Sequence, residues 1–122
     1  MKIYKGVYSE YAIAAFVRAA ELGYPSLEKI KSISTSKPVR EDLRAVYSTF
    51  ETLHQSGEGE TVRAVMAIYR PSHESGTRIS RAILHERLSI YALGRSYSEE
   101  SVYRMLANAR RLFAKKRGLT AE

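Results

Sequence analysis

Three side chains near the C-terminus have the types and the spacing to contact base edges in DNA. Arg104, Asn108 and Arg111 follow one another at intervals of four and three residues, so on an α-helix they would share one face. Arginine can bond guanine through two parallel hydrogen bonds, and asparagine can do the same for adenine. Ala107 lies beside them, and its small side chain would let the helix sit deep in a groove. The pattern predicts a helix face that contacts DNA.

Hydroxyl groups and further cations flank this face. Ser98 and Ser101 precede it at a predicted helix N-terminus, where hydroxyls and backbone N–H groups suit a phosphate. Lys115, Lys116 and Arg117 add positive charge that attracts the DNA backbone whatever its sequence. The predicted DNA-contacting residues are Arg95, Ser98, Ser101, Tyr103, Arg104, Ala107, Asn108, Arg111, Lys115 and Lys116.

These residues need a helix over residues 98–117 to position them. Ser98 is a short acceptor directly before Glu99 and Glu100, so we predict that it is the N-cap. An apolar set on the opposite side of the helix should be buried. This set consists of Val102, Leu106, Ala109 and Phe113. A plainer interpretation remains open, in which the basic residues form an ordinary solvated face that also favours the helix dipole.

The excess positive charge lies in the same part of the chain. The 122 residues carry a net charge of +7, with a pI of about 9.8. Residues 1–77 contain ten Lys and Arg against nine Asp and Glu, whereas residues 78–118 contain ten against three. Upstream of the helix the excess includes Arg78, Arg81, Arg87 and Arg95. Such an uneven charge distribution is typical of nucleic-acid-binding regions. An acidic protein or an acidic membrane would also attract this positive charge.

Other chemistries have little support in the sequence. The chain has no cysteine, which excludes disulfides, thiolate nucleophiles and cysteine-based zinc sites. His54, His73 and His85 match no zinc-binding spacing, and the sequence has neither a phosphate-binding glycine loop nor a nucleophile motif. We therefore expect no metal, no cofactor and no catalytic residue, in a protein that is not an enzyme.

The N-terminus predicts neither a signal peptide nor a membrane span. Residues 1–5 carry charge without a long apolar run, and the most apolar segment, residues 11–20, contains Arg18 and is too short to cross a bilayer. We therefore expect a cytoplasmic protein that associates with the nucleoid of a bacterial host and not with a membrane.

The rest of the chain has helical periodicity and no hairpin signal. The predicted helices before the last one span about residues 9–22, 26–32, 38–55, 58–70 and 78–93. Ser9 should cap the first, Gly94 should close the fifth, and Pro71–Thr77 should be a polar loop. The expected fold is all-α with five to six helices. Residues 1–57 would form a packing or oligomerisation region and residues 58–122 the DNA-binding region, within one compact domain.

The first helix is apolar almost all round, which is typical of a helix buried in the core or in a dimer interface. Tyr4, Tyr8 and Tyr11 could form an interface patch beside it, and Tyr97 and Tyr103 could flank DNA. A homodimer is therefore a candidate assembly.

A short glycine-containing turn joins the fifth helix to the last, which is the helix-turn-helix pattern. The stretch 97–119 also resembles the C-terminal helix of phage- and prophage-encoded regulators related to sigma factor region four, including the RinA- and ArpU-type late-gene activators. Members often show Ser-Glu-x-Thr-Val-Tyr-Arg and Ala-Arg-Arg-Leu-Phe-Ala, which match residues 98–104, with Ser101 for Thr, and 109–114. The resemblance covers about residues 58–119. It implies sequence-specific binding of promoter-like DNA and contact with RNA polymerase.

These patterns together predict a phage-type transcriptional regulator that binds double-stranded DNA through helix 98–117. Two alternatives stay open. The basic face could bind an acidic host protein, or the chain could be a small terminase-like DNA-packaging protein, which would require a ring-like oligomer.

Overall fold

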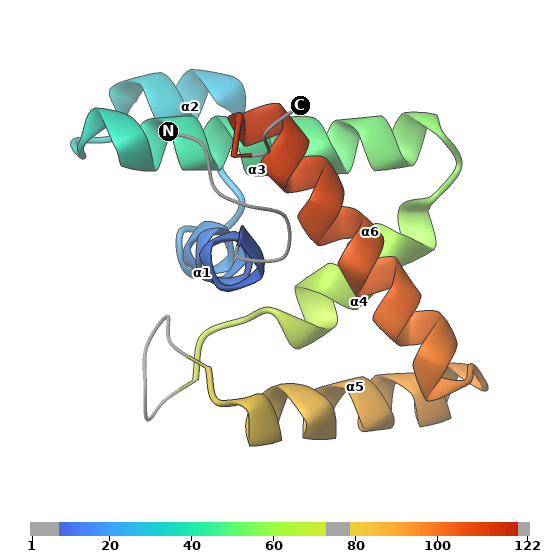
Figure 1. The fold of residues 1–122 in the computed structure, drawn as a ribbon. Helices are drawn as coiled ribbons and strands as arrows, with labels where there is room; N and C mark the ends of the chain where they lie inside the picture. Colours follow the sequence, from blue (N-terminus) through green and yellow to red (C-terminus); the bar gives the residue numbers. More distant parts are fainter. Residues whose placement is uncertain (1–7, 73–78, 120–122) are drawn as a thin grey trace.

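The computed structural model describes residues 8–72 and 79–119, and these residues form six α-helices (Figure 1). The helices are α1 (Tyr8–Glu21), α2 (Leu27–Ser32), α3 (Lys37–Gln55), α4 (Gly59–Ile68), α5 (Arg81–Arg95) and α6 (Glu99–Arg117). The predicted all-α class with five to six helices is therefore confirmed. None of these six helices is long and apolar enough to cross a membrane.

Serine caps begin four of the helices. Ser26, Ser36, Ser80 and Ser98 each accept a hydrogen bond from the backbone N–H three residues later, at 3.1–3.4 Å. The predicted N-cap role of Ser98 is confirmed. The same role for Ser9 is wrong, because α1 already includes Tyr8, whose ring packs in the core.

The fifth helix ends later than its glycine predicts. The stop at Gly94 is wrong, because α5 continues to Arg95 and the left-handed residue is Ser96, with φ 59°. This conformation lets the backbone N–H groups of Ser96 and Tyr97 bond the carbonyls of Leu93 and Ala92. The connector between α5 and α6 is therefore residues 96–98. Most of the predicted polar loop, including His73, lies outside the described residues, as do Arg78 and Tyr4.

The last helix lies at the centre of the packing and contacts α1, α3, α4 and α5. Figure 1 shows α6 crossing in front of α3 and α4, while α5 runs along the lower edge of the view. The four predicted core positions of α6 are all buried, with at most 3% of each residue exposed; they are Val102, Leu106, Ala109 and Phe113. Burying one large apolar side chain contributes about 1.5–3 kcal/mol, so this stripe fixes which face of α6 points outward.

An aromatic cluster joins the N-terminal helix to the same core. Phe16 of α1 is fully buried, and its ring lies 5.9 Å from Phe50, 5.8 Å from Tyr69 and 5.5 Å from Phe113, measured between ring centroids. Apolar side chains of α1 therefore pack against other helices of the same chain. Tyr8 is buried, so its ring is not available for an interface patch, whereas Tyr11 is half-buried and donates a hydrogen bond to Asp42 at 2.7 Å.

The fifth helix buries much less of its surface. Only Leu88 and Ala92 are buried, whereas Ile90 and Leu93 are 63% and 83% exposed. The guanidinium of Arg87 compensates by donating to the carbonyl oxygens of Ile68 and Arg70, at 2.9 and 2.8 Å. These bonds satisfy carbonyls at the end of α4 and tie α5 to it.

Candidate nucleic-acid interface

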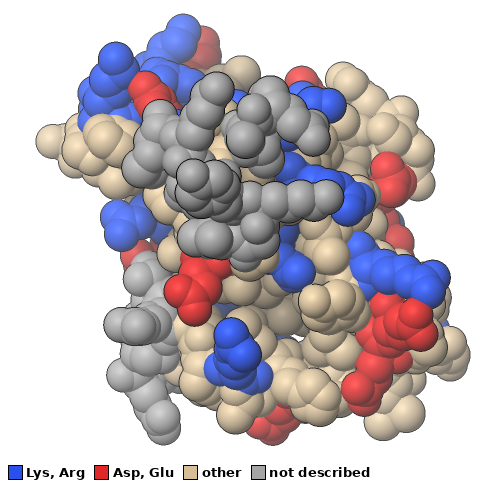
Figure 2. Space-filling view, in the orientation of Figure 1, with Lys and Arg blue, Asp and Glu red and all other residues tan. Residues whose placement is uncertain are grey.

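The outward side of α6 carries the residues that the sequence assigns to base contact. Arg104, Arg111 and Lys115 are exposed, whereas Ala107 and Asn108 are half-buried. We call Arg104, Asn108, Arg111 and Lys115 the outer stripe. On the face shown in Figure 2, Lys and Arg side chains lie along the course of α6. The fold thus gathers the predicted side chains on one surface, because the buried stripe holds the other side of the helix in the core.

The first residue of the outer stripe is engaged in an ion pair. The Arg104 guanidinium donates to the Glu100 carboxylate, with Nη2 2.5 Å from Oε1. Both side chains are largely exposed, at 75% and 72%. An exposed pair of this kind is worth only about 0.3–0.5 kcal/mol, so Arg104 can exchange Glu100 for another acceptor at little cost.

The middle of the outer stripe is a small hydrogen-bond chain. Arg111 donates to the side-chain oxygen of Asn108 at 2.9 Å, and the Asn108 amide donates to Glu58 at 3.5 Å. These two bonds orient the amide of Asn108. A bidentate contact with adenine would have to replace both of them, since it needs the same oxygen and N–H group.

The serine hydroxyls are used in capping the helix. The Ser98 oxygen accepts from the backbone N–H of Ser101 at 3.1 Å, and its hydroxyl donates to the Ser101 oxygen at 2.8 Å. Both residues are exposed. A phosphate at this end would therefore compete with the Ser101 oxygen for the Ser98 hydroxyl proton, while the Ser101 hydroxyl proton stays available.

Arg95 and Tyr103 each take part in a cation–π contact. The Arg95 guanidinium lies 5.4 Å from the Tyr91 ring centroid and 3.8 Å from the Glu60 carboxylate. Tyr103 is 57% exposed, and the Arg110 guanidinium lies 5.7 Å from its ring centroid. More than half of Tyr103 is therefore open to solvent, whereas Arg95 is held near α4 by Glu60.

Two basic residues of α6 that count toward the charge excess bond other helices and do not point into solvent. Arg110 donates to the hydroxyl of Tyr69 at 2.7 Å, and Arg117 donates to Asp42 at 2.6 Å. The predicted backbone-contacting role of Arg117 is therefore wrong, because its guanidinium is turned inward. The sequence carried a signal for this, since each arginine follows a buried residue, Leu106 or Phe113, by one helical turn of four positions.

Carboxylates gather at the N-terminus of α6. Glu99 accepts from the Ser89 hydroxyl at 2.8 Å and lies 3.6 Å from the imidazole of His85. Glu99 and Glu100 suit the positive end of the helix dipole and lie next to the outer stripe. The surface of α6 is therefore basic along the body of the helix and acidic at its beginning.

The contact between α4 and α5 centres on Glu60. The Tyr91 hydroxyl donates to this carboxylate, Arg63 lies 3.0 Å from it and Arg95 lies 3.8 Å from it. The hydrogen bond from Tyr91 lowers the pKa of Glu60, partial burial opposes this, and the two arginines lower the pKa further. Burial, followed by the Glu60 contact, raises the pKa of Tyr91 to about 12.

We expect the stability conferred by Glu60 to be lost in acid. Because its folded-state pKa lies below the usual 4.5, the contribution is present above that value and disappears as the pH falls through the folded-state pKa. Glu60→Gln should lower Tm at pH 7 and flatten the fall in Tm between about pH 5 and pH 3. Thermal unfolding followed by circular dichroism measures both effects. The control is Glu28→Gln, an exposed glutamate without an ion pair among the described residues; parallel wild-type and Glu60→Gln curves would contradict the assignment.

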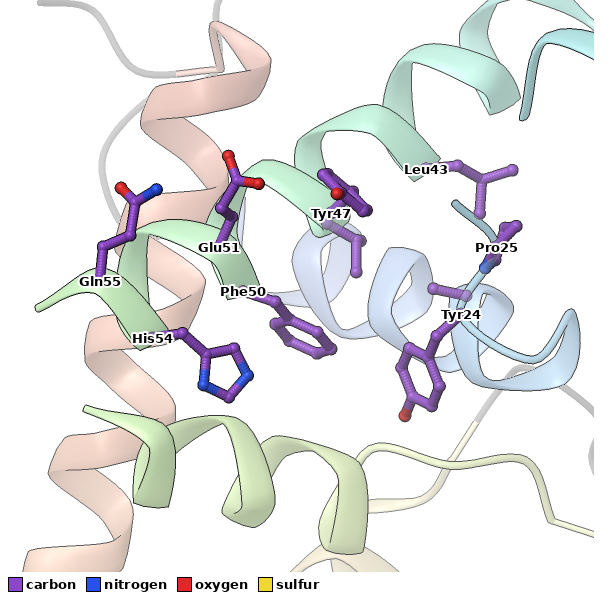
Figure 3. A pocket seen from close by; sticks show the side chains of 10 residues that line it. Tyr24, Pro25, Leu43, Tyr47, Phe50, Glu51, His54 and Gln55 are labelled. Carbon is purple, nitrogen blue, oxygen red and sulfur yellow. The ribbon is translucent and has the colours of Figure 1, made fainter. Parts of the chain in front are cut away.

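A separate hollow of about 340 Å³ lies beside α3 (Figure 3). Tyr24, Tyr47 and Phe50 supply aromatic walls, and the polar groups Glu51 and His54 come from the last turns of α3. Burial raises the pKa of the Tyr24 hydroxyl. Within residues 8–72 and 79–119, no three His, Asp or Glu side chains are grouped to hold a metal ion. The aromatic walls of the hollow suit an apolar group.

No family model, no curated protein and no solved structure matches the chain. The role of the α6 surface therefore has to be inferred from its own chemistry.

Proposed function

We propose that this protein is a transcriptional regulator without enzymatic activity, and that it reads double-stranded DNA with the outer stripe of α6. The observation that carries this proposal is that α6 has a buried apolar side and an exposed basic side. One side is fixed in the core by Val102 and Phe113, and the other presents Arg104 and Arg111 to solvent. A rigid helix with arginines along its exposed side matches what base recognition in the major groove requires.

The elements before α6 fit the role of a helix-turn-helix partner. We propose that α5 crosses the DNA backbone while α6 enters the major groove, as the two helices of helix-turn-helix proteins do. Residues 96–98 form the connector, and Arg81 at the start of α5 is exposed. The bonds from Arg87 to the end of α4 would keep α5 in place despite its small buried surface.

Binding would exchange protein contacts for DNA contacts. Arg104 would leave Glu100 and bond a guanine. Arg111 would leave the Asn108 oxygen, and the Asn108 amide would leave Glu58 to bond an adenine. Each of these contacts is at the surface, so breaking one costs no more than about 1 kcal/mol. Glu100, once released, can accept a hydrogen bond from the amino group of cytosine. This gives a carboxylate at the interface a role beside the DNA polyanion.

The two lysines at the end of α6 need no such exchange. Lys115 and Lys116 are exposed and have no ion pair among the described residues. They can meet backbone phosphates directly, and such contacts raise affinity without selecting a sequence.

We expect Lys115→Ala to weaken binding to all DNA sequences alike. Losing one phosphate contact releases about one counterion fewer, so the slope of log K against log salt should fall by about 1. Fluorescence anisotropy with a selected and a scrambled duplex, each at several salt concentrations, measures this. Lys29→Ala, which removes an exposed lysine on α2, is the matched control. A loss confined to the selected duplex would show that Lys115 reads bases instead.

Selection of bound duplexes from a random pool, supplemented with prophage promoter fragments, tests the function itself. We expect enrichment of one sequence and binding that falls steeply with salt. No retention of DNA at low salt would contradict the proposal. It would favour the alternative in which the same basic face binds an acidic protein, which a pull-down with the purified chain would then reveal.

A further inference from the structure

A second hollow lies where α6 passes α3, beside the end of the outer stripe. Its volume is about 330 Å³, and its walls come from one side of α3 and from the last turn of α6. The lining residues are Glu41, Arg44, Ala45, Ser48, Lys116 and Arg117. Two separate helices thus bring three cations around one concave surface.

The acidic groups of this hollow are already neutralised. Arg117 bonds Asp42 at 2.6 Å and lies 3.1 Å from Glu41, which in turn lies 4.0 Å from Lys37. Arg44 and Lys116 are exposed and have no ion pair among the described residues. The hollow therefore keeps two uncompensated positive charges.

The available donors are those that a phosphate group requires. Arg44 offers a planar fork of N–H groups, Lys116 offers a mobile ammonium, and the Ser48 hydroxyl has no hydrogen-bond partner within the described part of the chain. Ala45 leaves the wall between Arg44 and Ser48 without bulk. We propose that this hollow is an oxyanion site that binds a phosphate group through Arg44, Lys116 and Ser48.

The phosphate has two possible sources with the same chemistry. One source is a backbone phosphate of bound DNA, because Lys116 follows Lys115 of the outer stripe in the last turn of α6; this source rests on the proposed function. A free phosphate-bearing ligand is the other source and does not depend on it. Two arms of one experiment separate them.

The first arm is a titration of the full chain with inorganic phosphate, followed by ¹H–¹⁵N NMR at ionic strength held constant with chloride. We expect saturable shifts at the amides of Ala45, Ser48 and Lys116. Arg44→Ala should weaken the apparent affinity by on the order of 10-fold, and Arg44→Lys should recover part of it, since the charge remains and the fork is lost. Arg18→Ala, which removes an exposed arginine of α1, should change nothing. Shifts that never saturate, or that Arg44→Ala leaves unchanged, would overturn the proposal.

The second arm measures duplex DNA binding by the same variants. A weaker affinity and a smaller salt slope for Arg44→Ala, but not for Arg18→Ala, would identify the ligand as a DNA backbone phosphate. Phosphate binding that depends on Arg44 while DNA affinity does not would support the site and assign it to a free phosphate ligand. If the chain binds phosphate and no DNA at all, the site stands and the proposed function fails.

Discussion

Replacing Arg117 by alanine is expected to lower the free energy of unfolding by about 3 kcal/mol, although Arg117 belongs to a run of basic residues at the end of a helix. The Arg117 side chain is only 16% exposed, and its partner Asp42 is 15% exposed. Removing one partner of a buried pair typically costs about 3–5 kcal/mol, because the other charge remains without compensation. Because this pair remains partly exposed, we expect the loss of unfolding free energy to lie at the lower end of that range.

Three helices meet at this ion pair. Arg117 of α6 bonds Asp42 of α3, and the Tyr11 hydroxyl of α1 donates to the same Asp42 oxygen at 2.7 Å. Burial lowers the pKa of Arg117, but the Asp42 carboxylate outweighs it, so the pKa lies above its ordinary value. Burial and then Asp42 raise the pKa of Tyr11. Arg117 is therefore charged and Tyr11 is a donor around neutral pH.

Urea unfolding measures the prediction, with Lys116→Ala as the matched control. Lys116 is the neighbouring residue and is exposed, so its replacement should change the free energy of unfolding by less than about 0.5 kcal/mol. Equal effects of the two substitutions would show that the Arg117–Asp42 pair adds nothing to stability. Asp42→Asn, which keeps the shape of the side chain, separates the loss of charge from the loss of packing.

Replacing Arg104 by alanine is expected to weaken binding of the selected DNA sequence by about 1–3 kcal/mol, or roughly 5- to 150-fold. The reason is that a bidentate arginine–guanine contact carries discrimination as well as affinity. Affinity for unrelated sequences should fall far less, so the ratio of the affinity for the selected sequence to the affinity for unrelated sequences should decrease. Arg111→Ala should have a similar effect at a neighbouring base pair.

Competition assays with single-base variants of the selected site measure this loss of specificity. Arg18→Ala, which removes an equal charge from an exposed position on α1, should leave the ratio unchanged. Glu100→Gln should strengthen binding to sequences contacted by Arg104, since it weakens the competing ion pair and removes a negative charge beside the DNA. The glutamine oxygen can still accept the hydrogen bond from cytosine. Uniform weakening of all sequences by Arg104→Ala would place Arg104 on a phosphate and not on a base.

Much of α6 was predictable from its sequence because the signals there are local. A serine cap, a four–three–four apolar spacing and a glycine at the end define the helix, and the structure confirms Ser98 as its cap, with Val102 and Phe113 buried. The same spacing fixes which residues face outward, since 100° per residue leaves little freedom once one side is buried. Arg104 and Arg111 could thus be placed together without knowledge of the fold.

The partners of the charged residues were not predictable in this way. Composition counts Arg87, Arg110 and Arg117 as part of a basic surface, yet they bond the end of α4, Tyr69 and Asp42. The residues that they bond lie 17 to 75 positions away in the sequence. No periodicity within one helix contains information about such distant partners.

The sequence by itself determined where the helices lie and which sides of them are apolar, because caps and spacing act over a few residues. Tertiary structure alone decided which partner each of the inward-facing cations contacts. Packing α6 against α1, α3 and α4 turned Arg110 and Arg117 inward and left Arg104, Arg111, Lys115 and Lys116 at the surface. It also brought Arg44 of α3 beside Lys116. The physical reason is that an ion pair joins residues that are close in space but distant in the sequence, whereas helix formation depends on residues that are close in the sequence.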